Sequence, residues 1–96
     1  MINCETFELT GYDNVKFLVD RFSKSYKSNK IIIFCHGFKG FKDWGGFNYV
    51  ADFFSNKNIT FYKFNFSHNG TSLNNPKELC DLEKFSQNNF TKELYD

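Results

Sequence analysis

Two histidines lie in polar turns, each just after a run of apolar, β-prone residues. His36 follows residues 31–35, and His68 follows residues 59–66. An imidazole can take up or release a proton near neutral pH and can ligate a metal, so both are candidates for chemistry. Each also has a structural interpretation. His36 can brace its turn rather than act as a base, and His68 can be a solvated or turn-stabilising loop residue.

The cysteines form no recognisable metal or disulfide pattern. Cys4, Cys35 and Cys80 are an odd set at irregular spacing, without the paired Cys or His of a zinc site. Cys35 and His36 are neighbours, so in a strand they point to opposite faces and cannot easily share an ion. We expect free thiols, no metal and no cofactor, with Cys35 packed and inert. Neither a basic region nor a long apolar stretch follows Met1, which predicts a cytoplasmic location.

Alternation of apolar and polar residues predicts a β-hairpin early in the chain. Residues 5–9 and 15–21 alternate, and the turn-prone segment 11–14 separates them. Residues 31–35 are continuously apolar and β-branched, which is typical of a strand buried on both faces of a parallel sheet. Residues 59–66 predict a further strand of the same sheet.

A helix is expected between these last two strands. Residues 44–55 carry an apolar stripe at helical spacing, which we interpret as core rather than as a binding groove: Trp44, Phe47, Val50 and Phe54. The glycines at 45 and 46 weaken its first turn, so a late start is expected. Strand, helix and strand predict a βαβ unit and an α/β fold. Another helix is predicted to start near residue 90, with Asn89 as its N-cap.

The composition excludes several classes of function. The 96 residues carry 12 Lys and Arg against 11 Asp and Glu, which is too even a balance for a nucleic-acid-binding patch. Hydrophobic residues make up 41% of the chain, too many for disorder, and no apolar run approaches the roughly 18 residues of a membrane span. Aromatic residues reach 21%, with 14 Phe, a large apolar content for one small domain. We expect neither nucleic acid nor membrane as a partner.

The segment IIIFCHGF, residues 31–38, resembles the third strand and the following turn of α/β-hydrolases. Residues 40–54 resemble the first helix of that fold, residues 61–66 its fourth strand, and residues 67–72 a loop that in many members reads close to G-H-G-x-S. HGFKGFKDWGGF and KFNFSHNG are similar to a bacterial subgroup that is dienelactone-hydrolase-like or serine-aminopeptidase-like. The resemblance covers nearly the whole chain. It implies the amino-terminal part of a single α/β-hydrolase domain, residues 1–96, with an incomplete sheet.

The family's chemistry is acyl transfer by a Ser nucleophile, a His base and an acid, with backbone N–H groups as an oxyanion hole. By resemblance, the backbone N–H of Phe38 is one of these donors, and His36 and Gly37 support its turn. The same resemblance places the side chain of Phe38 in the acyl pocket. Lys39 and His68 are candidates for contact with a small ester or amide substrate. Lys39 and Lys42 flank the turn and can attract an acidic substrate or simply be solvated.

The chain departs from the family at the nucleophile, because no G-x-S-x-G occurs among its residues. Every serine lacks the flanking glycines of a nucleophile elbow: Ser23, Ser25, Ser28, Ser55, Ser67, Ser72 and Ser86. In the family the elbow follows the helix that would start near Asn89, and the acid and base come later. The sequence therefore predicts an amino-terminal fragment of a serine hydrolase that holds half an oxyanion hole and no triad, and that is inactive alone.

Two alternatives stay open beside the hydrolase. The chain can be a non-catalytic module that binds a small acidic or acyl ligand in the loops after its strands. It can also be a structural α/β fragment that self-associates. In the hydrolase topology the strand at residues 31–35 would be left as a bare edge, so we expect the isolated chain to self-associate through it.

Overall fold

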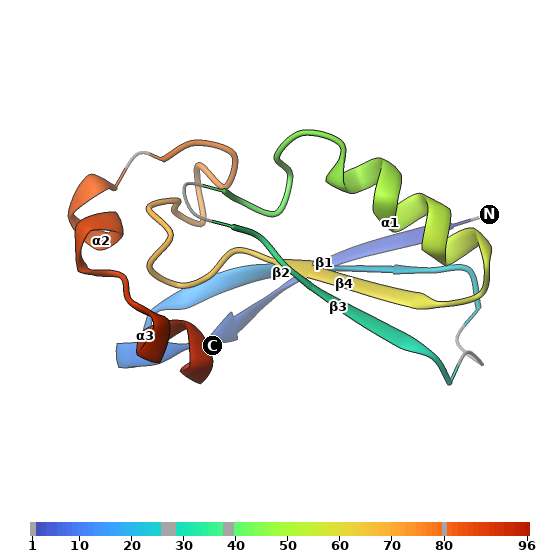
Figure 1. Cartoon of the computed structure of the whole chain (residues 1–96), viewed down its shortest axis with the longest axis horizontal. Coiled ribbons are helices and arrows are strands. Elements are labelled where there is room, and N and C mark those ends of the chain that lie inside the picture. The colour runs from blue at the N-terminus through green and yellow to red at the C-terminus, as the bar shows by residue number, and fades with distance from the viewer. Residues whose placement is uncertain (1, 26–28, 38–39, 80) are drawn as a thin grey trace.

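The computed structural model of the chain describes residues 2–25, 29–37, 40–79 and 81–96. Four strands form one mixed sheet, and the longest helix covers one face of that sheet (Figure 1). The predicted α/β class is therefore confirmed. The two remaining short helices gather at one end of the sheet.

The first two strands form the expected hairpin. β1 (Asn3–Thr10) pairs antiparallel with β2 (Lys16–Ser23). A 3-10 turn at Tyr12–Asn14 joins them, and Asp13 and Asn14 have φ of 56° and 58° there. Asp and Asn adopt this left-handed conformation more readily than most residues, which explains why the sequence of this turn could be recognised.

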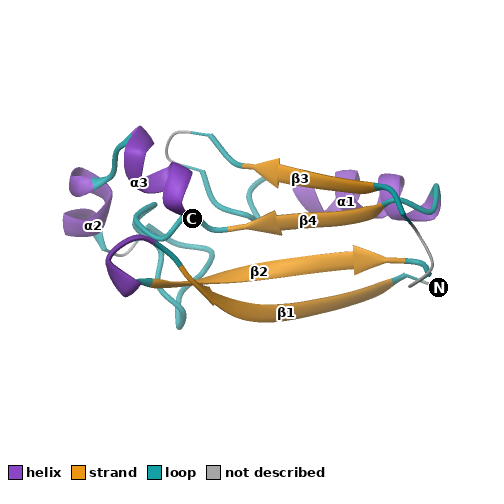
Figure 2. Cartoon of the chain, turned by 90° about the horizontal axis from the view of Figure 1, so that it is seen from below, coloured by secondary structure: helices purple, strands orange, loops and turns teal. Residues whose placement is uncertain are grey.

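A βαβ unit follows the hairpin, as predicted. β3 (Ile31–Cys35), α1 (Phe47–Asn56) and β4 (Thr60–Phe64) follow in order, and β3 and β4 pair in parallel. The sheet order is β1-β2-β4-β3, with β2 antiparallel to β4 (Figure 2). The helix begins only after Gly45 and Gly46, as expected from the low helix propensity of glycine.

β4 ends two residues earlier than predicted. The backbone N–H of Phe66 donates to the His36 imidazole rather than to a neighbouring strand. The backbone N–H of Asn65 still donates to the carbonyl of Leu18 in β2, and the chain leaves the sheet after it. Side chains make several of the contacts of the loop that follows.

Two short helices end the described chain. α2 (Leu82–Gln87) is capped by Asp81, whose carboxylate accepts from the backbone N–H of Lys84. α3 (Phe90–Tyr95) is capped by Asn89, which confirms the helix predicted near residue 90. Among the described residues, no helix combines the length and the apolar character that crossing a membrane requires.

The core lies between α1 and the sheet. Phe22, Ala51 and Phe61 form its buried centre, and the ring of Phe54 stacks on that of Phe61 with centroids 6.0 Å apart. The interpretation of the apolar stripe on α1 as core is only partly right. Trp44 is 56% exposed and Val50 is also exposed, because the helix turns Ala51 and Ser55 toward the sheet.

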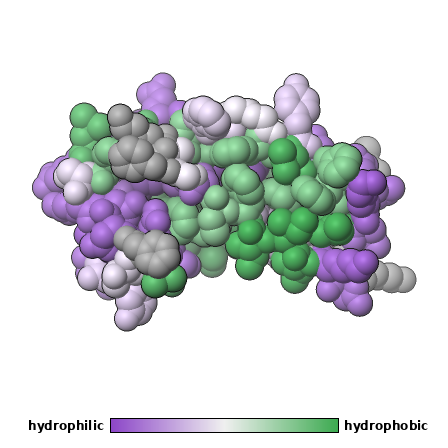
Figure 3. Space-filling view, in the orientation of Figure 1, coloured by the Kyte–Doolittle hydropathy of each residue, from purple (hydrophilic) through white to green (hydrophobic). Residues whose placement is uncertain are grey.

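β3 is not buried on both faces, which corrects the prediction for residues 31–35. Ile31 and Ile33 are 60% and 67% exposed, and Cys35 is exposed rather than packed. The reason is topological: among the described residues β3 pairs only with β4, and Ile31 and Ile33 point away from α1. The space-filling view shows a hydrophobic patch along β3 (Figure 3).

Candidate functional site

His36 ties the loop after β3 to the loop after β4. Its Nε2 accepts from the backbone N–H of Phe66 at 3.1 Å, so the ring proton is on Nδ1, which donates to the carbonyl of Gly37 at 3.0 Å. The ring also meets that of Phe66 edge-on, with centroids 4.9 Å apart. With both nitrogens bonded to the backbone and 7% exposure, the side chain has the geometry of a brace rather than of a base.

The hydrogen bonds of His36 require its neutral form. Burial lowers the pKa of His36, and the hydrogen bond to Gly37 offsets this only in part. Protonation would turn Nε2 into a donor that faces the N–H of Phe66. The brace therefore depends on the uncharged ring.

Asn69 reinforces the same junction from the loop after β4. Its side-chain oxygen accepts from the N–H and the hydroxyl of Thr71, at 2.9 and 2.6 Å. Its Nδ2 lies 3.4 Å from both the carbonyl oxygen of Gly40 and the Nε2 of His36. The loops that begin at the carboxyl ends of β3 and β4 are thus joined at His36, at Asn69 and by the bond from the Lys42 N–H to the side chain of Asn65.

Gly40 is required in this loop by space rather than by conformation. A Cβ at Gly40 would lie 2.9 Å from the carbonyl oxygen of Gly37, which already accepts from the Gly40 N–H. A Cβ at Gly37 would meet nothing within 4 Å. The predicted oxyanion donor, the backbone N–H of Phe38, and the predicted substrate contact Lys39 lie outside the described residues, so both stay predictions.

His68 is buried rather than solvated. It is 4% exposed, and its ring meets that of Tyr12 edge-on at 6.1 Å. Burial lowers the pKa of His68, and the nearby charge of Lys92 lowers it further. Contact between His68 and a substrate stays a prediction, and the burial of the ring argues against it.

Ser67, His68 and Asp96 come together, although they do not form a catalytic triad. The hydroxyl of Ser67 lies 2.9 Å from Oδ1 of Asp96 and 2.8 Å from Nδ1 of His68, and the Ser67 N–H donates to Oδ2 of Asp96. In a triad the serine donates to the histidine, and the carboxylate orients that histidine. Here the carboxylate bonds the serine directly, and Ser67 is 2% exposed. The cluster is structural.

Four charged side chains meet in a buried group that we call the Lys–Asp cluster: Asp20, Lys42, Asp43 and Lys63. The Nζ of Lys42 lies 2.9 Å from Asp20 and 2.7 Å from Asp43. The Nζ of Lys63 lies 2.7 Å from Asp20 and 3.0 Å from Asp43. The four side chains are between 0% and 9% exposed, and their formal charges cancel.

Hydrogen bonds from the lysines decide the protonation of the two aspartates. Burial alone would raise the pKa of Asp20, but hydrogen bonds from Lys63, Thr6 and Lys42 outweigh it and lower the pKa below its ordinary value. The pKa of Asp43 is lowered in the same way, because the bonds from Lys42 and Lys63 outweigh its burial. Burial would lower the pKa of Lys42, but its bonds to Asp43 and Asp20 raise it. All of these directions favour the ionised forms.

Local sequence patterns do not reveal this cluster. Lys42 was expected to be solvated or to attract a substrate, and it is 5% exposed. One signal was present in the sequence: Lys63 lies in the middle of an aromatic strand, between Tyr62 and Phe64. A lysine there needs a buried partner, but the pairing of Lys63 with Asp20 depends on the register of β2 and β4, which periodicity does not specify.

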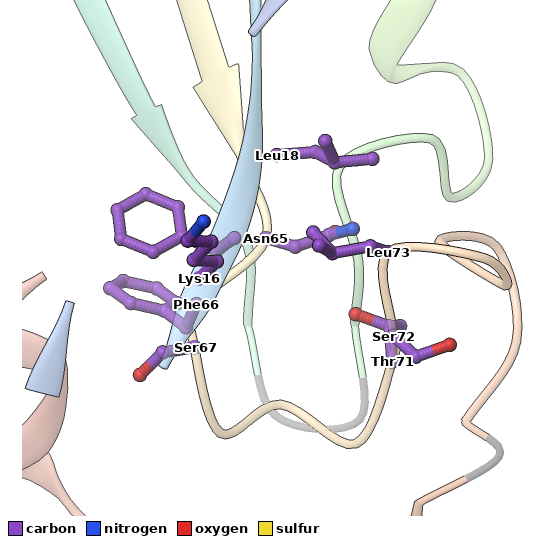
Figure 4. A pocket seen from close by; sticks show the side chains of 9 residues that line it. Lys16, Leu18, Asn65, Phe66, Ser67, Thr71, Ser72 and Leu73 are labelled. Carbon is purple, nitrogen blue, oxygen red and sulfur yellow. The ribbon is translucent and has the colours of Figure 1, made fainter. Parts of the chain in front are cut away.

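Two hollows differ greatly in size. The pocket of Figure 4, beside the loop after β4, measures about 10 Å³, which is room for about one water molecule. It is too small for an acyl ligand. A groove of about 490 Å³ runs along the face of the sheet opposite α1, lined mainly by apolar side chains: Leu9, Phe17, Val19, Ile31, Ile33, Tyr62, Phe64 and Asp96.

Within the described part of the chain, no three His, Cys, Asp or Glu side chains are grouped so that they could hold a metal ion. No protein-family model matches the chain, and no curated protein matches it.

Proposed function

We propose that these 96 residues are the amino-terminal part of a serine hydrolase that cleaves small esters or amides. The observation that carries the proposal is the brace at His36. It lies directly after a parallel strand and joins the two loops at the carboxyl ends of β3 and β4. Open α/β sheets place their sites at that edge. Residues 31–38 resemble the oxyanion turn of α/β-hydrolases, so the chemistry that we assign to this edge is acyl transfer.

In this proposal the chain supplies one oxyanion donor and the wall beside it. The backbone N–H of Phe38 donates a hydrogen bond to the substrate carbonyl oxygen and stabilises the negative charge that develops on it during attack. The nucleophile, the acid and the base come from residues outside these 96, and the 96-residue chain is inactive alone. The protein works in the cytoplasm and needs no cofactor.

A fluorophosphonate probe tests the proposal, because it reacts with the activated serine of serine hydrolases. The probe is added to the protein encoded by the whole reading frame, and the modified peptide is identified by mass spectrometry. We expect one labelled serine within a G-x-S-x-G outside these 96 residues, together with hydrolysis of p-nitrophenyl acetate. The 96-residue chain is the matched control, and it should be neither labelled nor active. A label on Ser67 or any other serine of the 96, or no label in either protein, would overturn the proposal.

We propose as a second property that the isolated chain self-associates through β3. The exposure of Ile31 and Ile33 supports this, because both border the apolar groove and lie on a strand with one unpaired edge in the described sheet. Unpaired N–H and C=O groups on an apolar edge strand can pair with a second copy.

A further inference from the structure

We propose that the Lys–Asp cluster is a positioning device for the turn that carries the oxyanion donor. Asp20 belongs to β2 and Lys63 to β4, whereas Lys42 and Asp43 belong to the loop between β3 and α1. Two of the four ion pairs, Lys42 with Asp20 and Lys63 with Asp43, connect this loop to the sheet. The inference rests on the proposed hydrolase function for its catalytic meaning, although its structural part can be tested without it.

Apolar packing holds this loop only weakly. Trp44 is 56% exposed, and a Cβ at Gly45 or Gly46 would meet nothing within 4 Å. Polar contacts take the place of packing. Besides the ion pairs, the backbone N–H of Lys42 donates to the side-chain oxygen of Asn65 at 2.7 Å. Ion pairs and hydrogen bonds are directional, so they select one geometry for a loop that packing alone would leave less well defined.

The cluster lies close enough to the turn to set its position. Lys42 is two residues after Gly40, whose N–H donates to the carbonyl of Gly37. The same Gly37 carbonyl accepts from the Nδ1 of His36. A displacement at Lys42 is therefore passed to Gly40 and, through its hydrogen bond, to Gly37. Misplacement of a catalytic group by about 1 Å can lower a rate by about 100-fold.

The charges also suggest a clean test. Removing one charged member would leave an unbalanced charge in the buried cluster and could unfold the protein. The double variant Lys42→Met/Asp43→Asn removes one charge of each sign and leaves the pair of Lys63 with Asp20 intact. It therefore removes both charges that the loop contributes to the cluster. The two charges that the sheet contributes remain and still cancel. The matched control is Lys57→Met/Asp52→Asn, the same two changes at exposed positions, Asp52 in α1 and Lys57 at its C-cap.

Both double variants are made in the protein encoded by the whole reading frame. The first readout is amide hydrogen exchange of residues 36–46, β2 and β4 by mass spectrometry. The second is the pair of constants kcat and KM for p-nitrophenyl acetate. For Lys42→Met/Asp43→Asn we expect exchange at least tenfold faster in residues 36–46, with β2 and β4 still protected. We expect kcat to fall by about 10- to 100-fold with KM within about threefold, because the donor acts mainly in the transition state.

The outcomes separate the two proposals. If exchange in residues 36–46 stays as slow as in the control, the positioning role is overturned, whatever the enzyme does. If exchange accelerates but kcat is unchanged, the cluster holds the loop but does not position a catalytic donor, and this inference is also overturned. If the unmodified protein shows no esterase activity and no probe labelling, the proposed function fails, and faster exchange would still establish the anchoring of the loop. General loss of protection in β2 and β4 would show a merely stabilising cluster and contradict the inference.

Discussion

His36 shows how a single side chain can connect two loops without being charged. Its ring donates to Gly37 and accepts from Phe66, and this pattern needs one particular neutral tautomer. Burial lowers the pKa of His36, which favours the neutral form. A histidine that could be a catalytic base in the sequence is thus one whose surroundings in the fold disfavour the protonated form.

Acid should weaken this brace before it affects the Lys–Asp cluster. The pKa of His36 is lowered in the folded state, so the unfolded chain binds more protons as pH falls below about 6.5, and stability falls with it. The lowered pKa values of Asp20 and Asp43 act only in more acidic solution, below about 3.9. We expect the free energy of unfolding, measured in urea, to decrease between pH 7.5 and pH 5.5.

In the variant His36→Gln, the free energy of unfolding should decrease less between pH 7.5 and pH 5.5 than it does in the unmodified protein. His68, whose pKa is also lowered, accounts for a further part, so His68→Gln serves as the comparison and the double variant should be nearly flat over this range. A slope that is unchanged in the double variant would contradict this origin of the pH dependence.

The Lys–Asp cluster should show strong coupling between its members. Lys63→Met leaves two buried carboxylates with one lysine, and we expect it to lower the free energy of unfolding by about 3 to 5 kcal/mol. Lys63→Met/Asp20→Asn restores neutrality and should cost less than the sum of the two single variants. Urea unfolding of the four proteins measures the coupling. The exposed Lys16→Met is the control and should change stability by no more than about 0.5 kcal/mol. Additive single effects would contradict a coupled cluster.

At the scale of elements, the start of α1 depends on two glycines with different backbone conformations. Gly45 has φ of 58°, in the left-handed region, whereas Gly46 has φ of −92° and is the N-cap. Gly45→Ala should lower the free energy of unfolding by about 1 to 2 kcal/mol, because an alanine is strained at positive φ. Gly46→Ala is the comparison at a negative φ and should cost less, about 0.5 kcal/mol, because alanine is a poorer N-cap than glycine. Equal effects in thermal or urea unfolding would show that the conformation of Gly45 is not what limits the start of the helix.

The same elements show what could be predicted from the sequence. The hairpin, the βαβ unit, the late start of α1 and the N-cap at Asn89 follow from local patterns of apolar, turn and capping residues, and all are present. The exposure of β3 and of Trp44 could not be predicted from such patterns. An apolar strand looks the same in sequence whether a neighbour covers it or not, and helical spacing does not fix which residues of a stripe face the sheet.

The candidate site was harder to predict than the fold, because it depends on contacts between distant residues. The position of His36 was evident from the turn after β3, but its acceptor role depends on Phe66, 30 residues away. Three of the four ion pairs in the Lys–Asp cluster join residues that are separated by 20, 22 and 43 positions. The periodicity of the sequence carries no information about contacts at that separation. The only sign of buried charges in the sequence is a lysine, Lys63, in an otherwise aromatic strand.

At the scale of the whole molecule, the two faces of the sheet differ. α1 covers one face, and the groove of about 490 Å³ runs along the other. We expect the 96-residue chain to form dimers or larger species in sedimentation velocity experiments at tens of micromolar. Ile33→Lys places a charge on the edge strand and should shift the chain toward monomer. Tyr49→Lys, on the exposed side of α1, is the matched control and should leave association unchanged. A monodisperse monomer at high concentration would contradict association through β3.

The carboxylate of Asp96 has a consequence for the order of folding. It accepts from the backbone N–H of Tyr12, 84 positions earlier, and from Ser67. The hairpin and the βαβ unit close much shorter segments of chain, and closing a longer one costs more conformational entropy. The contacts of Asp96 should therefore form last, after the strands have paired. The end of the sheet nearest the hairpin turn would then be the last part of the protein to become ordered and the first to open.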